Sequence, residues 1–201
     1  MADPISMTIA VAALGVSVLT SWANLLRRGS IRLTKPAFIA FCYDVGGDGR
    51  IQPKVFIRAL LYSTGRRGQV VENMYLIVRC NETQQTFSIW GHGDEKLSRG
   101  SGLFVGETGL VTNHHFNPPS STSPFHFLPG SYEIRVFATL VGRRNPIPLC
   151  TATVSVPEGM KRDIESPGSA VWFDWEPAAH CYEARIETRQ NARLAGLMEK
   201  H

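Results

Sequence analysis

Motifs of the common enzyme classes are absent from this sequence. It has no G-x-S-x-G nucleophile elbow, no G-x-x-x-x-G-K-[ST] phosphate loop and no H-E-x-x-H zinc motif. Cysteine is scarce as well: the four cysteines show no C-x-x-C spacing and are too few for a disulfide scaffold, so we expect reduced, mostly buried thiols. The chain therefore offers no catalytic residue and no cofactor site, and these absences favour a non-enzymatic role.

Charge is limited in amount. Charged residues make up 19% of the chain and apolar residues 43%, which are the proportions of a folded globular protein rather than a disordered one. The formal net charge of +4 is modest, and a basic cluster near residue 30 accounts for the excess. We therefore expect no nucleic-acid partner.

An uncharged segment near the N-terminus, from Pro4 to Leu26, is the clearest positive feature. As a helix, its roughly 23 residues would be about 34 Å long, enough to cross a hydrocarbon core about 30 Å thick. No basic residue precedes the segment, whereas Arg27, Arg28, Arg32 and Lys35 follow it. The positive-inside rule predicts a single-pass anchor with the C-terminal domain in the cytoplasm, and the charge order disfavours a cleaved signal peptide.

Small and polar residues recur on one side of this predicted helix. They repeat at steps of three or four, which brings side chains onto one helical face: Ala10, Ala13, Ser17, Ser21 and Asn24. Such a face allows close helix packing, so we expect it to contact a membrane protein partner or a second copy of the chain. Two alternatives stay open. The first is that the helix spans the membrane alone and the small residues are merely tolerated in it. The second is that the helix lies in the plane of the membrane interface.

The rest of the chain has the pattern of short strands separated by turns. Stretches rich in β-branched and aromatic residues are 36–43, 53–63, 70–80, 86–90, 131–141 and 148–156. Apolar residues occupy the even positions from Tyr132 to Leu140, while Glu133 and Arg135 fall between them. The even positions from Pro148 to Val156 repeat this alternation, which is typical of strands with one buried face.

The phrase LPGSYEIRV at residues 128–136 resembles the start of strand F in immunoglobulin-like and fibronectin-like sandwiches, with Tyr132 as the corner tyrosine. The resemblance spans residues 30–157 and implies an all-β, immunoglobulin-like β-sandwich. Paired cysteines and a core tryptophan are missing at their expected strand positions, and residues 91–127 do not divide cleanly into strands. A helix, a basic stop and a sandwich in this order also resemble many uncharacterised bacterial membrane-anchored proteins.

These patterns divide the chain into three parts. Residues 1–28 form the N-terminal membrane anchor, residues 29–157 the β-sandwich domain, and residues 158–201 a C-terminal extension. Within the extension we expect a strand over residues 170–175 and a helix over residues 178–199 that packs on the sandwich. The alternative is that this helix binds a partner.

The sandwich arrangement brings two arginine pairs together. If 53–63, 70–80, 131–141 and 148–156 are strands B, C, F and G, then the B–C and F–G loops share one end, where the anchor also enters. The basic residues expected to face the membrane or a partner there are Arg27, Arg28, Arg66, Arg67, Arg143 and Arg144. Each contributes on the order of 1 kcal/mol beside an anionic leaflet. One alternative is that both loop pairs are solvated turn tips, and another is that the same patch binds RNA or a nucleotide.

The remaining motifs are weak. Residues 44–51 contain half of a calcium loop but lack its final bidentate Glu, so a glycine-rich turn is favoured. His92, His114, His115 and His126 suggest a metal site, but adjacent histidines in a strand point to opposite faces, so we predict no metal.

The sequence thus predicts a membrane-anchored, cytoplasm-facing binding module. The alternative is a small-ligand-binding or hydrolytic domain that uses residues 91–127.

Overall fold

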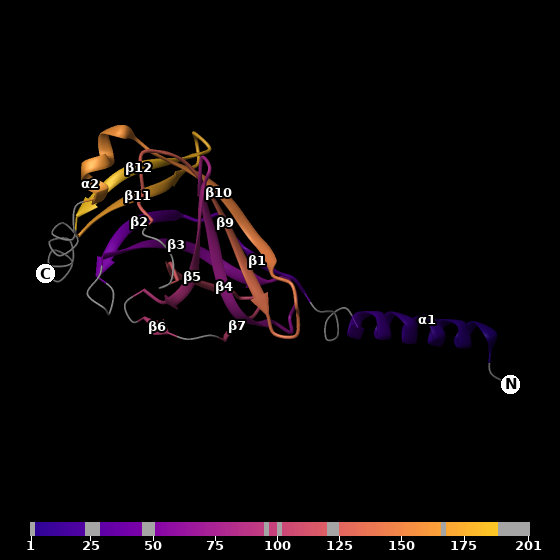
Figure 1. Cartoon of the computed structure of the whole chain (residues 1–201). Helices are drawn as coiled ribbons and strands as arrows, with labels where there is room; N and C mark the ends of the chain where they lie inside the picture. The colour runs from indigo at the N-terminus through magenta and orange to yellow at the C-terminus, as the bar shows by residue number, and fades with distance from the viewer. Residues whose placement is uncertain are drawn as a thin grey trace, which may run out of the picture.

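The computed structural model describes residues 3–22, 29–45, 51–94, 97–99, 102–119, 125–165 and 168–188. It consists of one N-terminal helix that points away from a β-rich domain (Figure 1). The expectation of a mostly-β chain that begins with an apolar helix is confirmed.

Helix α1 (Pro4–Ser21) begins where Asp3 caps it, because the Asp3 carboxylate accepts a 3.1 Å hydrogen bond from the Ile5 amide. None of its residues is buried, and its mean hydropathy is 1.7. By length and composition this helix is able to cross a membrane, although a signal sequence meets the same criteria. A wholly exposed apolar helix needs a membrane or a partner to cover it.

The strands that follow are β1 (Ile31–Leu33), β2 (Phe38–Val45), β3 (Ile51–Ser63), β4 (Gln69–Cys80), β5 (Thr83–His92), β6 (Ser98–Arg99), β7 (Leu103–Val105), β8 (Leu110–Asn117), β9 (Gly130–Leu140) and β10 (Ile147–Val156). A 3-10 turn, η2 (Glu158–Met160), and a short helix, α2 (Lys161–Glu165), lead to β11 (Ser169–Glu176) and β12 (Cys181–Thr188). All the strands predicted above are present, and the additional strands are β8, β12 and the short β1, β6 and β7.

The strands form one continuous antiparallel sheet with the order β10-β9-β4-β5-β8-β3-β2-β11-β12. The short strands β1, β6 and β7 pair with β3, β5 and β4. The sheet curves until its two end strands, β10 and β12, meet along a seam, so the domain is a near-closed barrel (Figure 1).

The immunoglobulin-like sandwich is not confirmed, although some of its predicted strand neighbours are present. The stretches assigned to strands C, F and G lie side by side as β4, β9 and β10, as that fold requires. However, β5 pairs with both β4 and β8, so one sheet replaces two separate layers. A register shift between Ile89 and Gly91 marks a β-bulge in β5, and such bulges bend a strand enough to turn it from one side of the barrel to the other.

Tyr132 forms the hydrogen bonds that the resemblance implies for a corner tyrosine. Its hydroxyl donates to the carbonyl oxygen of Leu128 and accepts from the Leu128 amide, both at 2.6 Å. The ring is 1% exposed and packs edge-on against Phe41. Burial raises the pKa of the Tyr132 hydroxyl far above its usual value, so the group stays neutral.

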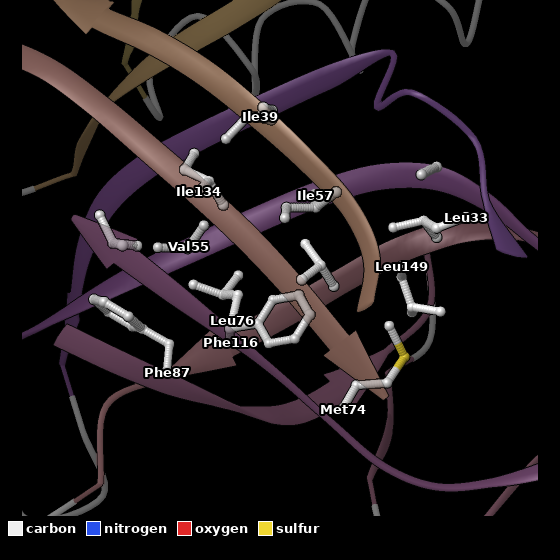
Figure 2. Close-up of a cluster of buried hydrophobic side chains, with 14 of the residues drawn as sticks. Leu33, Ile39, Val55, Ile57, Met74, Leu76, Phe87, Phe116, Ile134 and Leu149 are labelled. Carbon is white, nitrogen blue, oxygen red and sulfur yellow. The ribbon is translucent and has the colours of Figure 1, made fainter. Parts of the chain in front are cut away.

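The core fills the inside of the curved sheet, where apolar side chains from several strands converge (Figure 2). The predicted alternation is confirmed on β9, whose alternate residues are buried, and β3 shows the same alternation from Val55 to Ser63. It holds on β10 only from Ala152 onward. A register shift between Pro148 and Cys150 leaves Pro148 exposed and turns Leu149 inward, because a bulge reverses the faces of the residues before it.

The predicted C-terminal helix is wrong over residues 178–188, because residues 178–180 form a turn and residues 181–188 form strand β12 paired with β11. Tyr182, Ala184 and Ile186 pack against the core at a spacing of two, and the Tyr182 hydroxyl donates a 2.9 Å hydrogen bond to the Pro36 carbonyl oxygen. Residues 189–199 of that prediction lie outside the described residues.

Candidate functional site

The segment that follows α1 is fixed to the loop between β3 and β4. The Ser30 amide donates a 2.8 Å hydrogen bond to Thr64 Oγ1, and the Thr64 amide donates a 2.9 Å bond to the Ser30 carbonyl oxygen. The Gln69 side-chain amide donates to the Gly29 carbonyl oxygen at 2.6 Å. Gly29 lies so close to Gly65 that an added Cβ would be 2.1 Å from the Gly65 nitrogen. The chain therefore enters the sheet at this end of the barrel.

Both arginine loops lie at the same end. Arg66 and Arg67 lie in the loop that Thr64 and Gln69 border, and Arg143 and Arg144 lie in the loop between β9 and β10. These loops are neighbours because the start of β4 pairs with the end of β9, and the Val141 amide donates a 3.0 Å hydrogen bond to the Val70 carbonyl oxygen. Arg27 and Arg28 lie outside the described residues.

Three of these arginines have uncompensated charge within the described part of the chain. Arg66 Nε lies 3.9 Å from Glu107 Oε2, and both side chains are exposed. Arg67, Arg143 and Arg144 are exposed and form no ion pair with any described acidic group. This end of the barrel is therefore positively charged on a solvent-facing surface.

Exposed apolar side chains accompany the arginines, and the sequence pattern did not identify them. Phe104 is 66% exposed, Val141 62% and Val70 39%. Val70 and Phe104 are opposite each other in the β4–β7 pair, and the Phe104 ring lies over Gly68. We call the exposed group of Arg66, Arg67, Val70, Phe104, Val141, Arg143 and Arg144 the anchor-proximal surface. The segment 103–105 indicates only a short strand, because no sequence pattern tells which face of it meets solvent.

The small-residue face of α1 is free of contacts with the described part of the domain. Ala10, Ala13, Ser17 and Ser21 are all exposed, whereas Asn24 lies outside the described residues. The predicted helix–helix contact through this face stays a prediction.

Residues 91–127 contribute to a basic and aromatic cluster on the outer face of β3, β5 and β8. Lys54 Nζ lies 4.5 Å from the centre of the Trp90 ring and 3.3 Å from an Asp44 carboxylate oxygen. The Arg99 guanidinium lies 4.1 Å from the same ring, and the His115 ring packs edge-on against Phe56. Lys54 is 6% exposed, and its pairing with Asp44 compensates its charge within the cluster.

The adjacent histidines point to opposite faces, as the strand period requires. His115 Nε2 lies 3.4 Å from the Gly93 carbonyl oxygen, while His114 is fully buried and neither of its ring nitrogens has a hydrogen-bond partner. Burial lowers the pKa of His114 to about 4, and burial followed by the nearby Lys54 charge lowers the pKa of His115. Within the described residues, no group of three or more metal-ligating side chains is found.

Comparison with known proteins adds no family assignment. No protein-family model matches the chain, and no curated protein matches it either.

Proposed function

We propose that this protein is a membrane-anchored, non-enzymatic binding module whose domain rests on the cytoplasmic membrane surface through the anchor-proximal surface. The observation that carries the proposal is the hydrogen-bonded junction at Gly29 and Ser30. It joins the exposed apolar helix α1 to the end of the barrel that holds the unpaired arginines and Phe104. A single-pass anchor would hold this end of the barrel beside the lipid headgroups.

The chemistry of the surface suits an anionic leaflet. Basic side chains gain on the order of 1 kcal/mol each near such a surface, and the gain decreases over a Debye length. Exposed Phe104 and Val141 supply apolar area that the interface between headgroups and acyl chains can cover. Together, charge and apolar area favour docking over free rotation about the anchor.

The cytoplasmic location of the domain is supported by the basic residues that follow α1, because positively charged flanks stay inside.

The immunoglobulin-like relationship is part of this proposal. Its support is the order β10-β9-β4 and the Tyr132 hydrogen bonds to Leu128. Contact between anchors through the small-residue face of α1 is also part of the proposal.

Hydrogen exchange measured on the full chain in nanodiscs tests the docking. We expect amides in residues 64–68 and 141–146 to exchange more slowly in discs that contain phosphatidylserine than in discs of phosphatidylcholine alone. The difference should disappear at high salt, because salt screens the attraction between arginines and headgroups.

Two charge-matched double variants provide the control. Arg143→Gln with Arg144→Gln should remove most of the protection, whereas Arg79→Gln with Lys161→Gln, away from the anchor-proximal surface, should leave it unchanged. Equal exchange in both kinds of disc, or equal effects of the two double variants, would contradict the proposal.

A further inference from the structure

A cleft of about 410 Å³ lies on the seam where the two ends of the sheet meet. It is lined by β10 residues 151–155, by residues 180–182 at the start of β12, and by Lys35 and Trp175. Beyond the cleft, Ala184 and Ile186 of β12 pack against the same core as β10.

The two strands beside the cleft run in the same direction. Eight successive antiparallel pairings separate β10 from β12 in the sheet order, and an even number of reversals restores the original direction. A segment that enters the cleft and runs the opposite way would be antiparallel to both strands, and antiparallel pairing is the more stable arrangement per residue.

The free edge of β10 has no charged residue. Its ladder to β9 is regular from Thr151 to Val156, so every second residue directs its N–H and C=O groups toward the seam. Edge strands are usually protected by charge, as β12 is by Glu183, Arg185 and Glu187. The sequence of β10, IPLCTATVSV, lacks this protection and is therefore suited to accept another strand.

The cleft is positively charged. The Lys35 ammonium lies 3.5 Å from the centre of the Trp175 ring and forms no ion pair with any described acidic group. His180 lines the cleft next to Trp175, and the lining contains no carboxylate. A cation held on an aromatic ring beside a free strand edge fits an acidic side chain of a bound peptide.

We propose that this cleft binds an extended acidic peptide segment of a protein partner. The peptide backbone pairs with β10 over residues 151–155, and an Asp or Glu side chain of the peptide faces Lys35. Residues 189–201 of the chain itself are a poorer occupant, because they carry Arg189, Arg193 and Lys200 against a single Glu199. This proposal is independent of membrane docking, since the cleft is not part of the anchor-proximal surface.

Binding of synthetic hexapeptides to the full chain in detergent micelles tests the proposal. The probes are fluorescein-labelled Thr-Val-Thr-Val-Thr-Val peptides with Glu placed at the second, third or fourth position, so that several registers are covered. Matched probes carry Lys instead of Glu, or a central Pro that blocks strand pairing. We expect at least one Glu probe to raise fluorescence anisotropy, and the Lys and Pro probes to bind at least tenfold more weakly.

Two further measurements separate strand addition from simple charge attraction. Lys35→Glu should weaken binding of the Glu probe tenfold or more, whereas Lys161→Glu, which makes the same charge change outside the cleft, should not. Hydrogen exchange should slow within residues 151–155 when the probe is bound. Absence of binding by every Glu probe, equal effects of the two variants, or binding without this protection would overturn the proposal. A dimer with residues 151–155 already protected in the absence of peptide would also overturn it, since a second copy would then occupy the edge.

Discussion

The side-chain amide of Gln69 and the carbonyl oxygen of Gly29 are joined by a 2.6 Å hydrogen bond. This bond connects the first residue of β4 to the segment that leaves α1. It fixes where the anchor meets the barrel, and therefore which loops lie next to the membrane if α1 spans one.

Gly29→Ala should destabilise this junction. The new Cβ would lie 2.1 Å from the Gly65 nitrogen, so the backbone must move, and overpacking of this kind costs about 1–3 kcal/mol. Urea unfolding of the full chain in detergent measures the loss. Gly159→Ala is the control, because nothing lies within 4 Å of its added Cβ. Equal stability of the two variants would show that the junction is not tightly packed.

Tyr132→Phe should reduce the free energy of unfolding by about 1–3 kcal/mol, because both backbone groups of Leu128 lose their partner, the Tyr132 hydroxyl. Tyr75→Phe is the matched control. Tyr75 stacks on Phe137, and no hydrogen bond of its hydroxyl is found within the described residues, so its change should stay within about 0.5 kcal/mol. A Tyr132→Phe variant as stable as this control would contradict the corner-tyrosine assignment.

Stability should fall as the pH decreases from 6.5 to 4, and His114 should account for part of that fall. Its folded pKa of about 4 lies below the ordinary value of 6.5, so the unfolded chain takes up a proton that the folded chain does not. The stabilisation from a neutral His114 is complete above pH 6.5 and is lost as the pH falls to 4, by roughly 3 kcal/mol.

The variant His114→Leu should flatten this pH dependence by that amount, as measured by urea unfolding across the range. His126→Leu, at an exposed position, should keep the parent profile. An unchanged slope in His114→Leu would mean that the ring is hydrated and not buried as described.

Phe104→Ala should weaken membrane docking by about 1–2 kcal/mol, since an aromatic ring gains roughly this amount when it leaves water. The readout is the hydrogen exchange of residues 64–68 in phosphatidylserine nanodiscs. Ile51→Ala is the control, because it removes a similarly exposed apolar side chain from the end of β3 that is distant from the anchor-proximal surface. This variant should have no effect on docking. If both variants reduce protection equally, the docked surface is not the one proposed.

A reporter fused after His201 that is active only in the cytoplasm should give a signal in the membrane fraction. The expectation follows from the basic residues after α1. Activity confined to the opposite compartment, or a soluble product shortened at its N-terminus, would instead identify α1 as an export signal.

Much of the sheet was predictable, because a strand that buries one face has a period of two. The even positions of β9 show this clearly. The failures have local causes. The bulge at Pro148 depends on a pairing partner that the strand sequence does not reveal. In β12, Tyr182 and Ile186 are spaced by four, which suits a helix as well as a strand. The segment becomes a strand because β11 offers it an edge to pair with, and the segment's own sequence does not reveal that edge.

The candidate site was predictable to the same degree. The proximity of Arg66 and Arg143 was expected from the immunoglobulin-like resemblance, which implies that strands C and F are neighbours, and the pairing of β4 with β9 produces it. The exposure of Phe104 depends on which face of β7 the rest of the sheet leaves uncovered, and it needed the structure.

The uncharged edge of β10 could in principle pair with the same edge of a second copy. If α1 spans the membrane, every copy stands with the same orientation, and every β10 starts from the anchored end and runs toward the far end of the barrel. Antiparallel pairing of two such edges would require one copy to be upside down relative to the bilayer. The anchor would thus prevent neighbouring copies from joining through an edge that is left open for a partner free to approach in the opposite sense.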